Sequence, residues 1–298
     1  MTEISIIIPT FNREEMLYGS VSSALAALPT RGEVIVVDDH SVTPAAKILE
    51  GFETDLEQGR LRIVLNHMGN GPAAARNHGV SEALGQIVLF LDDDDLMHPS
   101  YPGFVLEMQA LGYAYGFAAI KRFQDGTQPV AQLAGDVTEV PLADLSFKKQ
   151  IGGLGCGFWV KREVFNSIGG INPALRVNED TDLSLRLLKS GAQGVFSPRL
   201  AIYVRDHASP AAHLTNSTPA ALRAKYFKIL LHEHRAWLGT QREAREFLMR
   251  RYVKMLTKTL NLRELVGGLR WLGADLSLWI YGFANYLMYR IKGKDNFH

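Results

Sequence analysis

Short apolar runs alternate with segments of helical periodicity from the first residues onward. The apolar runs predict buried strands at residues 4–8, 34–37, 61–65 and 87–91. Apolar positions at helical spacing between them predict helices near residues 16–28, 45–56 and 72–83. Continuous apolar strands joined by single helices are typical of a parallel sheet covered on both faces. The pattern therefore predicts an α/β fold with a mainly parallel sheet flanked by helices.

The rest of the chain is irregular at first and then helical. Residues 113–157 contain weak strands around 113–123 and a loop-rich stretch, which we expect to form the far edge of the sheet and the acceptor side. A helix is predicted over 178–191, with Gly191 as its stop, and short strands at 195–196 and 201–204. From Pro219 onward the spacing predicts helices near residues 220–237, 242–260 and 262–291. We therefore expect a first domain of residues 1–218 and a C-terminal helical appendage of residues 219–298.

Charge divides the chain at the same place. Residues 1–218 hold 17 basic and 25 acidic side chains, and the remainder holds 15 and 6, so the two parts carry about −8 and +9. An acidic part is suited to a cation and a basic part to an anionic surface, either membrane or nucleic acid. A single cysteine, Cys156, excludes an intrachain disulfide, and the first residues lack the pattern of a signal peptide. We expect a cytoplasmic protein.

Polar residues follow each predicted strand, where parallel sheets bind their ligands. The most conspicuous are the four consecutive aspartates at positions 92–95. Like charges this close repel unless a cation neutralises them, and Mg²⁺ or Mn²⁺ would take carboxylate oxygens while leaving positions for phosphate. An acidic run in isolation is more often a solvated turn, but its place after a buried strand favours a metal site.

Three further polar segments have both a structural and a functional interpretation. Asp39 is suited to accept hydrogen bonds from a base or ribose, or to cap a helix. Arg76 would neutralise phosphate or the acidic sites, or lie on the surface. Glu179 and Asp180 begin a predicted helix, where they complement its dipole or supply a general base.

Together these segments resemble the family-2 inverting glycosyltransferases with a GT-A fold, over residues 3–210. The resemblance is carried by five short segments in the right order, at residues 5–13, 36–41, 74–79, 90–95 and 178–183. It implies that Asp180 is the catalytic base and that Asp92 and Asp94 are the two acidic positions of a D-x-D metal motif, with Asp95 as the extra carboxylate after it. The residues implied in nucleotide binding are Pro9, Thr10, Asn12, Arg13, Asp39, Arg76 and Asp93. The resemblance further assigns the sugar or acceptor pocket to Gly152, Gly153, Trp159 and Glu179, and a place near the diphosphate or metal to His207.

The resemblance implies transfer of a sugar, with UDP as the favoured carrier, to a hydroxyl of a saccharide or lipid-linked saccharide in polysaccharide or glycolipid synthesis. Mn²⁺ or Mg²⁺ would be the cofactor, and no nucleic-acid partner is expected. The alternatives are a nucleotidyltransferase, which would more naturally carry a glycine-rich basic loop after the first strand, and a non-catalytic module binding a membrane surface or nucleic acid through the basic tail. His232, Glu233 and His234 are not expected to bind metal, because histidines two positions apart on a helix face different sides.

The apolar and aromatic segment at residues 271–289 leaves three interpretations open. Asp275 and Asn285 interrupt it and Arg290, Lys292 and Lys294 follow, so a spanning helix would bury Asp275 at considerable cost. A helix lying on the inner face of the cell membrane would use the basic residues nearby. Packing within the fold or against a second subunit, as in a homodimer, is the third interpretation.

Overall fold

Residues 2–124, 138–155, 157–206 and 218–292 are described by the computed structural model. The chain divides into two units, Met1–Ala208 and Ser209–His298. The first unit is built on a sheet and the second on helices, so each is described by itself. The expected C-terminal helices are present, while the predicted boundary after residue 218 stays a prediction.

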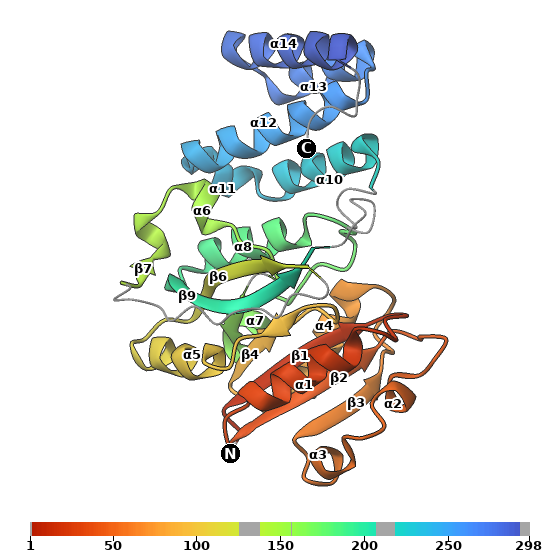
Figure 1. Ribbon diagram of the computed structural model, residues 1–298. Coiled ribbons are helices and arrows are strands. Elements are labelled where there is room, and N and C mark those ends of the chain that lie inside the picture. Colours follow the sequence, from red (N-terminus) through yellow and green to blue (C-terminus); the bar gives the residue numbers. More distant parts are fainter. Residues whose placement is uncertain (1, 125–137, 156, 207–217, 293–298) are drawn as a thin grey trace. The chain divides into compact units, whose positions relative to one another are not determined.

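The amino-terminal half of the sheet is parallel, as the apolar pattern predicts. Its strands are β1 (Ile4–Thr10), β2 (Gly32–Asp38), β3 (Leu61–Leu65) and β4 (Ile87–Phe90). They lie in the order β3-β2-β1-β4, and each pairs with its neighbour in parallel register (Figure 1). The connecting helices are α1 (Leu17–Ala27), α2 (Ala45–Ile48), α3 (Glu53–Glu57) and α4 (Pro72–Glu82).

The sheet continues beyond β4 with strands of mixed direction. These are β5 (Leu96–Met97), β6 (Tyr115–Phe123), β7 (Val140–Pro141), β8 (Trp159–Lys161) and β9 (Gly194–Arg205). β8 pairs antiparallel with β4 and β6, whereas β6 and β9 are parallel. The expectation that residues 113–123 form the far edge is wrong, because β6 lies between β8 and β9.

β9 is one continuous strand where the sequence predicts two short ones. Opposite the step from Ala118 to Ala119 of β6, its partners jump from Ser197 to Leu200. Pro198 and Arg199 are therefore accommodated as an irregularity of the pairing, which is how sheets tolerate a proline that has no N–H to donate. The polar interruption in the apolar pattern marks a bulge and not a strand end.

Helices cover both faces of the sheet, in agreement with the predicted fold class. One buried cluster includes Leu17 and Val21 of α1 and Tyr101 and Phe104 of α5 (Tyr101–Ala110). The other face is covered by α4, α7 (Arg162–Ser167) and α8 (Glu179–Ser190). Two short elements, η1 (Leu142–Asp144) and α6 (Phe147–Gln150), lie between β7 and β8 in the chain.

Glycines break two of the predicted helices. The helix expected over residues 45–56 is divided into α2 and α3 near Gly51, whose φ is 113°. The helix expected over 262–291 is divided at Gly273, which adopts a left-handed φ of 61°. A positive φ suits glycine far better than a residue with a Cβ atom, so these positions end helices that apolar spacing alone would continue.

The second unit is helical throughout its described part. Its helices are α10 (Ala220–Glu233), α11 (Arg235–Thr240), α12 (Arg242–Lys258), α13 (Leu262–Leu272) and α14 (Leu276–Lys292). Asp275 precedes α14 and does not lie inside a longer helix, and its Oδ1 accepts the backbone N–H of Leu278 at 2.9 Å. No helix in the described part of the chain combines the length and the apolar character needed to cross a bilayer.

Candidate active site

The carboxyl ends of the parallel strands bring the polar segments to one edge of the sheet. Thr10, the last residue of β1, is paired with Asp38, the last residue of β2, and Ile7 is paired with Phe90 of β4. The residues after these three strands must therefore emerge side by side. This places residues 11–13, 39–41 and 91–95 around one edge of the sheet.

Asp39 is held in a fixed orientation by three segments. Its backbone N–H donates to the Thr10 carbonyl at 2.9 Å. Its Oδ1 accepts the side-chain amide of Asn66 at 2.6 Å, and its Oδ2 accepts the backbone N–H of Gly71 at 2.7 Å. A carboxylate anchored on both oxygens is preorganised to present its remaining lone pairs to a ligand.

The loop after β1 is tied to the loop after β2 through Asn12. Asn12 adopts a left-handed φ of 52°, which asparagine tolerates better than most residues. Its backbone N–H donates to the hydroxyl of Ser41 at 3.0 Å, and its Oδ1 accepts the backbone N–H of Val42 at 2.9 Å. Asn12 therefore joins the two loops.

Arg13 lies against the middle of the acidic run. Its Nε is 3.6 Å from Oδ1 of Asp93, and its Nη2 is 3.5 Å from Oδ2 of Asp94. Oδ2 of Asp93 also accepts the backbone N–H of Phe11, at 3.4 Å. Asp93 and Asp94 thus both contact the loop after β1, and Asp93 alone accepts a backbone N–H from it.

Asp92 is enclosed by a buried arginine and a glycine. Oδ1 of Asp92 accepts a hydrogen bond from Nη2 of Arg76 at 2.5 Å. A Cβ atom added at Gly155 would lie only 2.2 Å from Oδ2 of Asp92, so the carboxylate occupies the space that a side chain at 155 would need. Burial alone would lower the pKa of Arg76, but the carboxylates of Asp92 and Glu179 outweigh burial and raise this pKa above its usual value.

Gly155→Ala is expected to displace the Asp92 carboxylate and to weaken Mn²⁺ binding by about tenfold, because a contact of this length forces one of the two groups to move. Electron paramagnetic resonance of free Mn²⁺ would measure the dissociation constant. Gly103→Ala is the matched control, since a Cβ atom at position 103 meets nothing within 4 Å. Unchanged Mn²⁺ affinity in Gly155→Ala would show that the orientation of Asp92 does not matter for metal binding.

Asp95 closes the acidic run in a buried position. Its Oδ1 accepts the backbone N–H of Arg205 at 2.8 Å, and Nε of Arg205 donates to the Asp94 carbonyl at 2.8 Å. Burial, together with the charge of Asp92, raises the pKa of Asp95 to about 8. Burial likewise raises the pKa of Asp93 to about 7.

These groups fit a hard divalent cation. Burial is the first cause of the raised pKa values of Asp93 and Asp95, and the negative charges of Asp92 and Asp94 raise both further. A cation would relieve this repulsion, and carboxylate oxygens are the donors that Mg²⁺ and Mn²⁺ prefer. The donor set therefore matches the predicted cofactor by its chemistry.

Glu179 and Asp180 begin α8. The preceding Asn178 has a left-handed φ of 66°, and Oδ1 of Asp180 accepts the backbone N–H of Thr181 at 2.6 Å. Burial, and then the charge of Asp180, raises the pKa of Glu179 to about 7, while Arg76 opposes the shift. Since Arg76 also pairs with Asp92, the start of α8 lies within electrostatic reach of the acidic run.

The stability of the chain is expected to depend on pH through Glu179. Its pKa is raised from 4.5 to about 7 on folding, so the folded state keeps a proton that the unfolded state releases between these values. Glu179 therefore destabilises the fold increasingly as pH rises from about 4.5 to 7. Relative to wild type, the free energy of unfolding of Glu179→Gln should rise by about 1–2 kcal/mol between pH 4.5 and 7, after a discount for solvent screening. Urea titrations at pH 5 and 8 would measure this difference in stability. An equal difference at both pH values would contradict the prediction.

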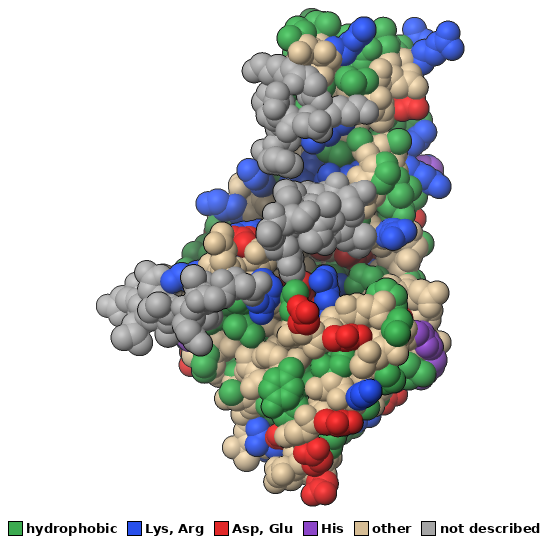
Figure 2. Space-filling model, turned by 45° about the vertical axis from the view of Figure 1, so that its right-hand side comes forward, with side chains coloured by type: hydrophobic (Ala, Val, Ile, Leu, Met, Phe, Trp, Pro, Cys, Tyr) green, Lys and Arg blue, Asp and Glu red, His purple; other side chains and the backbone are tan. Residues whose placement is uncertain are grey.

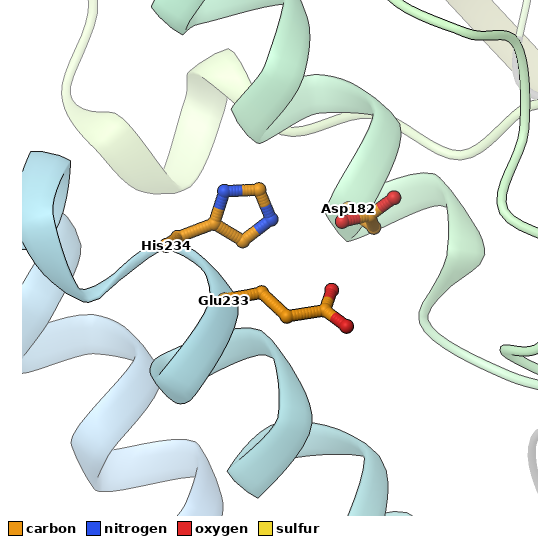
Figure 3. Close-up of side chains that lie close together, drawn as sticks. All are labelled: Asp182, Glu233 and His234. Carbon is orange, nitrogen blue, oxygen red and sulfur yellow. The ribbon is translucent and has the colours of Figure 1, made fainter.

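A separate ion pair, between Asp182 and Arg186, holds the first turns of α8. Asp182 lies on α8 (Figure 3), and its Oδ2 accepts Nε of Arg186 at 2.8 Å. Nη1 of Arg186 donates to the Ile168 carbonyl at 2.7 Å. Asp182 thus helps to hold α8 in place through Arg186. Figure 3 also draws Glu233 and His234, which belong to the second unit.

The structure corrects one predicted pocket residue and explains another. Trp159 is fully buried within the hydrophobic core on β8, so it does not line a sugar or acceptor pocket and we leave it out of the site. Close packing explains why position 152 is a glycine, because a Cβ atom there would lie 2.1 Å from the ring of Phe117. His207 lies outside the described residues. The roles of the other predicted residues stay predictions.

Sequence reasoning missed two residues that shape the site. Gly155 makes room for the Asp92 carboxylate, and Asn66 holds Asp39. The glycine-rich run around position 155 and the polar residue directly after β3 were the signals that pointed to them. Neither signal says which carboxylate is the partner, because that depends on the folded arrangement.

The fold and the acidic run at the strand ends define a transferase of the GT-A class. The solved structure of S. aureus TarS 1-349 in complex with UDP-GlcNAc superimposes with a TM-score of 0.65 and 19% identity, covering 99% of this chain and 93% of that one. The mannosyltransferase PcManGT from Pyrobaculum calidifontis, in complex with GDP-Man and Mn²⁺, gives a TM-score of 0.58 at 15% identity, with coverage of 98% and 81%. These likenesses confirm the predicted GT-A fold.

The family follows from the sequence comparison. The model described as glycosyl transferase family 2 matches residues 5–169, more than half of the chain, so the chain belongs to that family. An uncharacterized glycosyltransferase of Haemophilus influenzae is 27% identical over 256 residues, which are 82% of this chain and 80% of that protein. The succinoglycan biosynthesis protein ExoU of Rhizobium meliloti is 30% identical over 236 residues, 72% of this chain and 66% of its own length. The predicted family is thereby confirmed.

Proposed function

We propose that this chain transfers a sugar from a UDP-sugar to a hydroxyl group of a saccharide acceptor, with inversion at the anomeric carbon. The observation that carries the proposal is the convergence of Asp39, Arg76, the acidic run and the start of α8 at the carboxyl edge of the parallel strands. Transfer from a nucleotide-sugar needs groups that bind the nucleotide, groups that neutralise the diphosphate and a base for the acceptor hydroxyl, all side by side. Membership of glycosyl transferase family 2 supports the same conclusion.

The nucleotide would occupy the pocket between the loops after β1 and β2. Asp39 would accept hydrogen bonds from the base, and Asp93 would face the ribose. Pro9, Thr10, Asn12 and Arg13 would form the wall, and Arg76 would lie near the phosphates. UDP is the proposed carrier because it occurs with TarS, although PcManGT was solved with GDP-Man, so the base needs a direct test.

Asp92 and Asp94 are the proposed metal ligands. They are the first and third residues of the acidic run and pair with Arg76 and Arg13, whereas Asp93 and Asp95 each accept a backbone N–H. When bound, Mn²⁺ or Mg²⁺ would supply positive charge that stabilises the diphosphate as a leaving group. Arg76 would hold Asp92 in position for this role.

Asp180 would act as the general base. Its carboxylate would take the proton from the acceptor hydroxyl as that oxygen bonds to the anomeric carbon, while the bond from this carbon to the diphosphate breaks on the opposite side. Thr181 donates to Oδ1 of Asp180 and so fixes the rotation of the carboxylate. Glu179 and Gly153 would border the sugar and acceptor.

The proposed acceptor is a saccharide, carried on a lipid diphosphate, in polysaccharide or glycolipid synthesis. Two relatives support it by their names. The β-1,3-glucosyltransferase of Campylobacter jejuni acts on GalNAc(5)-diNAcBac-PP-undecaprenol, and WfgD of Escherichia coli acts on α-D-GlcNAc-diphosphoundecaprenol. The matches cover 38% and 35% of these two proteins.

A thermal-shift screen of nucleoside diphosphates and their sugars, with and without Mn²⁺, tests the proposal. We expect UDP and a UDP-sugar to raise the melting temperature only when Mn²⁺ is present. Slow hydrolysis of that UDP-sugar by the purified chain would show an active transferase site. Release of pyrophosphate from UTP and a sugar 1-phosphate would instead identify a nucleotidyltransferase and contradict the proposal.

A further inference from the structure

Helix α14 is apolar on both of its faces. Its inner face is buried within the C-terminal unit, where Leu278, Tyr286 and Tyr289 are at most 7% exposed. Gly282 packs on the same side, since a Cβ atom there would lie 3.2 Å from Val253 of α12. A helix with one buried face ordinarily presents charged and polar side chains on the other. α14 does not.

The outer face carries a stripe of five large apolar side chains. Their exposed fractions are 75% for Leu276, 61% for Ile280, 37% for Phe283, 56% for Leu287 and 81% for Ile291. Successive members are three or four residues apart, so they form a single row along the helix. We call these five residues the α14 stripe. Contiguous exposed apolar surface of this kind marks an interaction site.

The surroundings of the α14 stripe are basic. In the sequence, no acidic residue occurs between positions 276 and 292, and the basic residues at positions 290, 292 and 294 close or follow this segment. Residues 219–298 hold 15 basic and 6 acidic side chains. Figure 2 shows green and blue side chains over the C-terminal helices, with few red ones. A partner of the α14 stripe must therefore combine an apolar interior with negative charge.

We infer that the α14 stripe binds the surface of an anionic phospholipid membrane, with α14 lying in the plane of the interface. A bilayer offers acyl chains to the five apolar side chains and phosphates to the basic residues around them. Trp279 flanks the stripe and stacks on Phe283 with ring centroids 5.8 Å apart. Aromatic side chains favour the boundary between headgroups and acyl chains.

A second copy of this chain fits the α14 stripe less well. A specific protein interface takes about 20–30 residues from each side, whereas the stripe is one row of five. Symmetric pairing through the stripe would also bring together two segments that each carry a charge of about +9. Like charges facing each other oppose association. The positive charge around the stripe therefore favours an anionic membrane over a second copy of the chain.

Co-sedimentation of the full chain with phospholipid vesicles tests the inference. We expect binding to vesicles that contain phosphatidylglycerol, weaker binding to phosphatidylcholine alone, and a decrease as salt is raised from about 0.1 M to 1 M. The double variant Ile280→Ser with Leu287→Ser should partition at least about tenfold less, because it removes two apolar side chains from the middle of the stripe. No donor or acceptor is needed, so the result does not depend on the proposed function.

A matched control separates the stripe from exposed apolar residues in general. Leu84→Ser with Leu111→Ser changes two side chains of the first unit that are 60% and 68% exposed, and it should bind vesicles like wild type. Circular dichroism would verify that both variants fold, as expected for changes at exposed positions. Quenching of wild-type tryptophan fluorescence by brominated lipid gives a second readout, and Trp279→Phe should reduce it.

Two results would overturn the inference. In the first, the wild-type chain stays in the supernatant with anionic vesicles, or the stripe variant binds as strongly as the control. In the second, analytical ultracentrifugation without lipid finds a wild-type dimer that the stripe variant dissociates, which would make the stripe a subunit interface. Vesicle binding that the stripe variant alone loses would support a membrane surface.

Discussion

Asp180→Asn is expected to lower kcat for sugar transfer by about three orders of magnitude, while UDP affinity stays within about threefold of wild type. Asparagine keeps the shape of the side chain and an oxygen that accepts the N–H of Thr181. It loses the ability to take a proton from the acceptor hydroxyl. The substitution therefore removes the proposed chemical step without removing the local structure of α8.

The measurement separates chemistry from binding. Initial rates with a saccharide acceptor give kcat, and isothermal titration with UDP and Mn²⁺ gives the nucleotide affinity. Asp144→Asn is the matched control, because Asp144 is an exposed carboxylate of η1 that belongs to no proposed site. Wild-type turnover in Asp180→Asn would remove Asp180 from the mechanism, and a parallel loss of UDP affinity would assign it to binding instead.

The parallel half of the sheet could be predicted from the sequence because its signals are local. β3 spans the residues expected from its apolar run, and β1, β2 and β4 differ only at their ends. The order in which strands and polar segments alternate then places the acidic run at the ligand edge. Each of these inferences needs only a few neighbouring residues, so it does not require knowledge of which distant residues are in contact.

The interruptions of the elements could not be predicted from apolar spacing alone. Gly51 and Gly273 end helices through positive φ values, whereas Gly79 lies inside α4 because a side chain there would clash with Ile7 of β1. Sequence does not distinguish a glycine that terminates a helix from one that allows close packing. The tertiary neighbour decides, as it does for the bulge opposite Ala118 in β9.

The side-chain contacts inside the site likewise could not be predicted from the sequence. The partner of Arg76 is Asp92, 16 positions away, and the glycine beside that carboxylate is 63 positions further on. The resemblance assigns Trp159 to the pocket, yet its side chain is buried in the core. Its neighbours Phe158 and Val160 are fully buried as well, because helices cover both faces of the sheet at this strand.

The second large effect concerns Asp94 and the metal. Asp94→Asn is expected to weaken UDP binding about 10- to 100-fold, and chelation of Mn²⁺ should weaken wild-type binding by a similar factor. Asp94 also lies 3.5 Å from Arg13, so the substitution alone would not distinguish loss of a metal ligand from a disturbed arginine. The two treatments must therefore be combined in a cycle.

If Asp94 acts through the metal, chelation should change the UDP affinity of Asp94→Asn by less than about twofold, because both treatments remove the same interaction. If Asp94 acts only by holding Arg13, the two effects should add. Isothermal titration with UDP, in Mn²⁺ and in chelator, measures the UDP affinities of wild type, Asp94→Asn and the control Asp144→Asn that this cycle compares. Full sensitivity of Asp94→Asn to chelation would exclude Asp94 as a ligand, and insensitivity of the wild type would exclude a metal-dependent nucleotide site.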